Sequence, residues 1–100
     1  MGLARDDVLA AFDALEAALD TIVDTHDYTA LTPADKVALH ARMERSLRRA
    51  PTVGHRLTAS LTAEVEPRDL GAASWPDVLC TALRCSRTEA HRRLRHARVL

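Results

Sequence analysis

The residues best suited to chemistry are arginines near the end of the chain. Residues 84–98 hold six arginines, with Glu89 as their only acid. Guanidinium groups neutralise phosphates and can form bidentate hydrogen bonds with guanine edges, so this density is typical of a surface for a polyanion. Acids gather at the other end, where residues 1–40 hold eight of them against Arg5 and Lys36. The two ends can therefore also neutralise each other within a helical bundle.

Two short helices are expected to position these arginines. Residues 74–77, with the sequence SWPD, predict one helix start, because serine caps a helix and proline suits its first turn. Residues 86–89, with the sequence SRTE, predict a second start with a full capping box, in which Ser86 and Glu89 each satisfy the backbone N–H of the other. Residues 74–100 are therefore expected to form a helix-turn-helix-like pair.

The turn between these helices would contain Arg84 and Cys85. Repressor-type motifs commonly place glycine where Arg84 stands, because that residue often needs a left-handed conformation. Arg84 would cost about 1 kcal/mol there, unless the turn differs. Cys85 would be the hydrophobic residue of the turn, with Cys80 and Ala90 as small residues at the crossing. The cysteine spacing fits neither a redox pair nor a zinc site, which favours a role as small apolar fillers.

A rotation of 100° per residue divides the last helix into two faces. Ala90, Leu94 and Ala97 share the inner face. The residues expected to contact DNA lie on the outer face, on one shoulder and at the ends: Arg84, Arg87, Thr88, His91, Arg92, Arg95 and Arg98. Arg84 and Arg98 are assigned to phosphates. The alternatives are a solvated helix whose arginines complement its dipole, and a surface that binds another protein.

The N-terminal segment, residues 3–24, is expected to form an amphipathic helix. Its apolar residues recur at spacings of 4, 3, 4 and 3, as Val8, Phe12, Leu15, Leu19 and Ile22. We favour a helix that packs this stripe on the rest of the domain. A dimerisation helix is the alternative.

A long helix is predicted over residues 33–66. Thr32 can cap it, and Pro33 suits its first position. The apolar stripe keeps its phase across Pro51, which favours one helix kinked near that residue, eased by Gly54, over two separate helices. At 1.5 Å per residue the helix would be about 50 Å long. Part of its stripe would then stay exposed unless a partner covers it, which again suggests oligomerisation.

Other kinds of function lack a sequence signal. The five histidines form neither an HExxH motif nor a Cys/His ligand cluster, so we expect no catalytic residue and no metal. Neither a cofactor nor a small-molecule substrate is indicated. No stretch is apolar enough to span a membrane and no signal peptide is visible, which makes the cytoplasm the expected compartment.

Three segments resemble the 13E12 repeat family of actinobacterial proteins. They are residues 50–57 (APTVGHRL), 68–71 (RDLG) and 79–94 (LCTALRCSRTEAHRRL), and the resemblance covers about residues 30–100. It implies an all-helical N-terminal module that is often followed by an HNH nuclease domain in family members. The sequence contains no asparagine and no HNH histidines, so nuclease activity is not carried over.

Together these patterns predict one small all-α domain, residues 1–100. Its parts are an N-terminal helix and connector (1–31), a long kinked helix (32–66) and the helix-turn-helix-like pair (74–100). We expect it to bind DNA weakly or as a homodimer through the last helix, without catalysis. The alternatives are a helical protein-interaction or dimerisation module, and an inactive remnant of a longer HNH nuclease protein.

Overall fold

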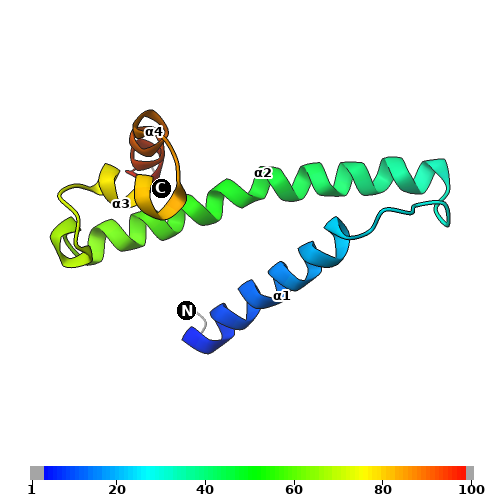
Figure 1. Cartoon of the computed structure of the whole chain (residues 1–100), viewed down its shortest axis with the longest axis horizontal. Helices are drawn as coiled ribbons and strands as arrows, with labels where there is room; N and C mark the ends of the chain where they lie inside the picture. The colour runs from blue at the N-terminus through cyan, green and yellow to red at the C-terminus, as the bar shows by residue number, and fades with distance from the viewer. Residues whose placement is uncertain (1–3, 99–100) are drawn as a thin grey trace. The chain divides into compact units, whose positions relative to one another are not determined.

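The computed structural model describes residues 4–98, and all regular elements in that range are helical (Figure 1). They are α1 (Arg5–Val23), α2 (Pro33–Glu64), the short 3-10 helix η1 (Pro67–Leu70), α3 (Trp75–Leu83) and α4 (Arg87–Arg98). The predicted all-α fold is therefore confirmed. Contacts divide the chain into two compact units, Met1–His40 and Ala41–Leu100, with the division inside α2.

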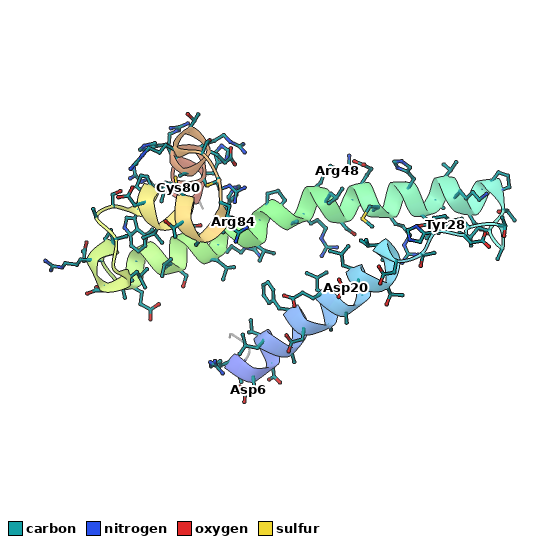
Figure 2. All side chains as sticks on the ribbon, viewed as in Figure 1. Asp6, Asp20, Tyr28, Arg48, Cys80 and Arg84 are labelled. Atoms are coloured by element: carbon teal, nitrogen blue, oxygen red, sulfur yellow. The ribbon has the colours of Figure 1, made fainter. Side chains whose placement is uncertain are left out.

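The first unit contains α1, a connector and the first residues of α2. Asp6 and Asp7 lie in the first turn of α1, where carboxylates complement the positive end of the helix dipole. The side chains of this unit, including those of Asp6, Asp20 and Tyr28, project from the backbone, and only Leu31 is as much as half-buried among its described residues (Figure 2). The apolar stripe of α1 was expected to pack on the rest of the domain. Within this unit, no such packing is made.

The start of α2 is fixed by a capping box. The Asp35 backbone N–H donates to Thr32 Oγ1 at 3.0 Å, and the Thr32 N–H donates to the Asp35 carboxylate at 3.1 Å. The predicted cap at Thr32 is therefore confirmed, and Asp35 completes it from the other side.

The helix then continues through Pro51 as one element of 32 residues. This confirms one long helix over two separate ones, and its end at Glu64 lies two residues before the predicted end. The kink near Pro51 stays a prediction.

In the second unit the chain turns after α2 and continues into α3 and α4. The Asp69 carboxylate accepts from the Glu66 N–H at 2.9 Å at the start of η1. Gly71 ends η1 in the left-handed region with φ 75°, a conformation that costs glycine little. The core of this unit is thin and small: its buried residues are Thr58 of α2, Leu79 of α3, and Ala90 and Ala97 of α4.

Candidate nucleic-acid interface

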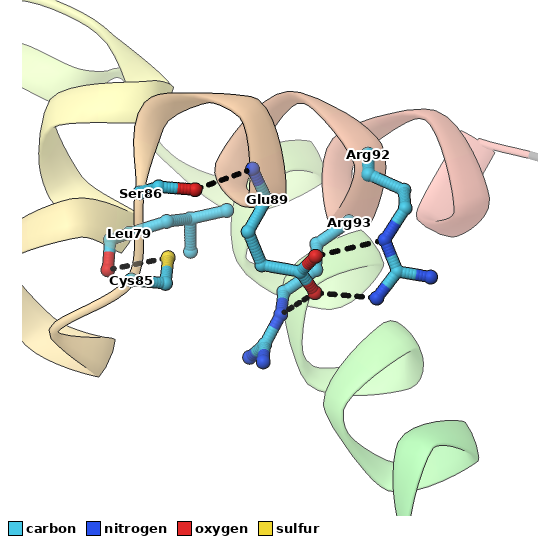
Figure 3. A network of polar contacts seen from close by, with 6 residues as sticks. All are labelled: Leu79, Cys85, Ser86, Glu89, Arg92 and Arg93. Atoms are coloured by element: carbon cyan, nitrogen blue, oxygen red, sulfur yellow. Dashed lines mark hydrogen bonds and ion pairs between the residues drawn. The ribbon is translucent and has the colours of Figure 1, made fainter.

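The turn between α3 and α4 places Arg84 in the left-handed region. Arg84 has φ 53° and ψ 41°, and it is the only residue other than glycine with positive φ within residues 4–98. The expectation of a left-handed residue at Arg84 is confirmed. The half-buried Cys85 thiol lies 3.7 Å from the Leu79 carbonyl oxygen, so the turn hydrophobe also contacts α3 (Figure 3).

Serine caps start both helices, as the sequence predicts. Ser74 Oγ accepts from the Asp77 backbone N–H at 3.3 Å, and Ser86 Oγ accepts from the Glu89 N–H at 3.1 Å. The second half of the box at Ser86 is not formed, because the Glu89 carboxylate turns toward Arg92 and Arg93 instead (Figure 3). Three charge-assisted bonds from two guanidinium groups take the place of one bond from a backbone amide, which explains this correction.

The Glu89 carboxylate accepts three hydrogen bonds from two arginines. Arg92 Nε lies 2.8 Å from Oε2 and Arg92 Nη2 lies 2.6 Å from Oε1, while Arg93 Nε lies 2.8 Å from Oε1 (Figure 3). The bonds from Arg92 and then Arg93 lower the pKa of Glu89 to about 2. The same carboxylate raises the pKa of Arg92. The network stays charged throughout the physiological pH range.

A second ion pair joins the two helices. Arg87, the first residue of α4, donates to the Asp77 carboxylate in the first turn of α3. Sequence analysis did not predict this contact, because the partners are ten residues apart and meet only when α3 and α4 pack. The pair connects the N-terminus of α4 to α3 at the surface.

The inner face of α4 matches its prediction. Ala90 has no exposed surface and Ala97 has 6%, whereas Leu94 is half-buried. On α3, Leu79 is 5% exposed, whereas Leu83 is exposed. Small residues such as Ala90 let two helix backbones approach closely, so this contact sets how α4 is presented.

His96, which the sequence left without a role, contacts α2. Its ring meets that of His55 edge to face, with the centroids 5.2 Å apart and the planes at 71°. This geometry is a favourable one for aromatic rings. It ties α4 to α2 on the side of α4 that also carries Glu89 and Arg93.

All seven residues predicted to contact DNA are exposed. Arg84 lies at the turn, Arg87 pairs with Asp77, and Arg92 pairs with Glu89. Thr88 lies in the first turn of α4. Three others, His91, Arg95 and Arg98, line one groove.

This groove has a volume of about 570 Å³ and is bounded by α2, α3 and α4. Its apolar part includes Trp75 and Leu94, and its basic side chains are those of His91, Arg95 and Arg98. Sequence analysis assigned Trp75 only to a helix start. Its status as the single tryptophan of the chain is the one signal that singled it out. The structure thus brings three predicted contact residues together beside an aromatic side chain.

Residues 4–98 show neither a metal-binding cluster nor a membrane-spanning helix. No group of three or more His, Cys, Asp or Glu side chains in that range is placed to hold a metal ion. Within the same range, none of the helices combines the length and apolar character that crossing a membrane requires.

The chain belongs to the family described as a domain of unknown function, DUF222, whose sequence profile matches residues 37–100. An uncharacterized protein of Mycobacterium tuberculosis strain H37Rv is 34% identical over 97 residues, covering 93% of this chain and 41% of the relative. An uncharacterized protein of strain CDC 1551 is 35% identical over 79 residues, and one of Mycobacterium bovis is 34% identical over 79 residues. Each of these two alignments covers 79% of this chain and 33% of the relative, so the chain spans well under half of these curated relatives. No solved structure matches the chain significantly.

Proposed function

We propose that this member of the DUF222 family binds DNA through α4, in the cytoplasm and without a catalytic step of its own. The observation that carries the proposal is the anchoring of an arginine-rich helix by its opposite face. Ala90 and Ala97 are buried while all seven predicted contact residues are exposed. A recognition helix needs this combination, because side chains can meet base edges and phosphates in register only when their helix is held firmly.

The charge of α4 favours a polyanion. The helix holds five arginines, and Glu89 is its only acid. One carboxylate shared by Arg92 and Arg93 neutralises about one of the two guanidinium charges. The pairs Arg87–Asp77 and Arg92–Glu89 lie at the surface, where ion pairs contribute little to stability. A phosphate can therefore replace either carboxylate at little cost.

The dimensions of α4 also suit a groove of duplex DNA. Its 12 residues make a helix about 18 Å long, and the major groove is about 12 Å wide. In the proposed complex two arginines contact phosphates: Arg84, in the turn before α4, and Arg98, at the end of α4. Thr88, Arg92 and Arg95 lie between them and contact base edges.

The resemblance to the 13E12 repeat family supplies a context for this activity. Members of that family often carry an HNH nuclease domain after the helical module. We propose that in such longer proteins the α3–α4 pair positions the protein on DNA, while catalysis belongs to the other domain. An inactive remnant, the competing interpretation, predicts that residues 1–100 bind no DNA.

The test is a fluorescence-anisotropy titration of the chain with a labelled random duplex at two salt concentrations. The proposal predicts binding that weakens steeply as salt rises, because phosphate contacts release counterions. The double variant Arg92→Ala plus Arg95→Ala should lose binding. Absence of binding by the unchanged chain at low salt would overturn the proposal.

A matched control separates the site from general charge. Arg45→Ala plus Arg48→Ala removes the same two charges from the exposed surface of α2. This variant should retain most of the affinity. Equal losses in the two double variants would show that binding does not reside in α4.

A further inference from the structure

The α1 helix exposes a continuous apolar stripe. Val8, Phe12, Leu15, Leu19 and Ile22 are between 37% and 62% exposed. Leu9 and Val23 widen the stripe, and they are exposed as well. At 100° per residue these seven side chains span an arc of about 140°. Contiguous apolar surface of this kind marks an interaction site.

A second exposed stripe lies along α2. Leu39, Met43, Leu47, Val53 and Leu57 follow one face of that helix, and each is at least 36% exposed. This stripe is about 27 Å long and that of α1 is about 21 Å, at 1.5 Å per residue. The two stripes are therefore similar in length and in kind.

The charges beside the two stripes are opposite in sign. The α1 helix carries five acids and Arg5 as its only base, whereas residues 33–50 of α2 carry five bases and two acids. Asp20 on α1 and Arg48 on α2 belong to these two sets (Figure 2). On a helical projection Glu16 and Asp20 lie along one edge of the stripe of α1, and Arg42 and Arg49 lie along one edge of that of α2. An α1 helix is thus complementary to α2 in both apolar surface and charge.

We propose that a second copy of this chain covers these stripes, with α1 of each copy packed on α2 of the other. Both stripes are exposed in a single chain, so a second copy can supply an α2 to each α1 and an α1 to each α2. Two copies related by a two-fold axis supply the missing neighbour to each stripe and form a four-helix interface. A 40-residue unit without a buried side chain in its described part is also too small to be stable alone, which oligomerisation remedies. This inference does not depend on DNA binding.

The first test is the mass of the full chain in solution, measured by sedimentation equilibrium over a concentration series. The expected result is the mass of two chains, falling toward one on dilution. Leu15→Glu plus Leu19→Glu places charges in the centre of the stripe and should give the mass of one chain. Ala10→Glu plus Ala17→Glu adds the same charge on the opposite face of α1 and should keep the dimer. A single-chain mass for the unchanged protein at all concentrations would overturn the proposal.

A charge exchange tests whether the contact is between copies. Glu16→Lys plus Asp20→Lys in one variant, and Arg42→Glu plus Arg49→Glu in another, should each weaken self-association. An equal mixture should restore the dimer, because each interface then pairs opposite charges again. If mixing changes nothing, α1 is covered by its own chain or by a different partner, and the proposal is wrong. Unchanged fluorescence of Trp75 in every variant would show that the second unit is still folded.

Discussion

Glu89 and Arg92, one helical turn apart on α4, form a bidentate ion pair. Arg92 Nε lies 2.8 Å from one carboxylate oxygen, and Nη2 lies 2.6 Å from the other. The same carboxylate binds Arg93, so one acid orients two of the five arginines of the helix. An anion that binds Arg92 or Arg93 must compete with Glu89, which makes this residue the natural place to adjust affinity.

Replacing Glu89 with glutamine is expected to strengthen DNA binding. The change removes the competing carboxylate and raises the net charge of α4 by one. Affinity should rise several-fold at low salt, and the slope of log K against log salt should steepen by about one. Anisotropy titrations at several salt concentrations measure both quantities. Glu64→Gln, at the end of α2, removes an equal charge elsewhere and should change neither. A weaker complex with Glu89→Gln would contradict the proposed interface.

The same network predicts a loss of stability in acid. The pKa of Glu89 is lowered from 4.5 to about 2 in the folded chain by its bonds to Arg92 and Arg93. A group whose pKa is lower in the folded chain than in the unfolded chain stabilises the folded state. This contribution is fully present at pH values above the pKa of the unfolded chain. That contribution is lost as the pH falls from about 4.5 through 2. Urea unfolding monitored by Trp75 fluorescence at a series of pH values measures it. The variant Glu89→Gln should show a smaller change over this interval, and an identical pH dependence would count against the network.

Local sequence signals predicted the elements well because caps and periodicity act within a few residues. Ser74 and Ser86 start their helices as expected, and the phase of the stripe across Pro51 correctly favoured one helix. The hydrogen-bond partners of the Glu89 carboxylate were less predictable. The capping box and the arginines three and four residues later compete for Glu89, and their relative strength decided the outcome.

Contacts between elements were outside the reach of sequence reasoning. The ion pair between Arg87 and Asp77 needs α3 and α4 to cross, and no spacing rule relates those residues. The groove that contains Trp75 likewise needs three helices in place. In contrast, the left-handed position of Arg84 was predictable, because the turn imposes it at a fixed offset between two capped helices.

Arg84→Gly is expected to stabilise the second unit by about 1 kcal/mol. Glycine adopts φ 53° without the steric cost that a side chain brings. For a domain of this size the melting temperature should rise by about 4–8 °C. Arg84→Ala removes the same charge but keeps a Cβ, so its stability should stay below that of the glycine variant. Calorimetry on both proteins measures the difference, and equal melting temperatures would show that the turn is not strained.

Ala90→Leu is expected to destabilise the α3–α4 pair by about 1–3 kcal/mol. Ala90 has no exposed surface, and extra methylene groups there must push the two helices apart or take an unfavourable rotamer. Thr88→Leu introduces the same side chain two residues earlier, at an exposed position of the same helix, and should change stability little. Chemical unfolding followed by Trp75 fluorescence reports on this unit, since Trp75 begins α3. If both leucine variants unfold at the same denaturant concentration, Ala90 does not lie at a close helix contact, and the anchoring on which the proposed DNA interface depends is absent.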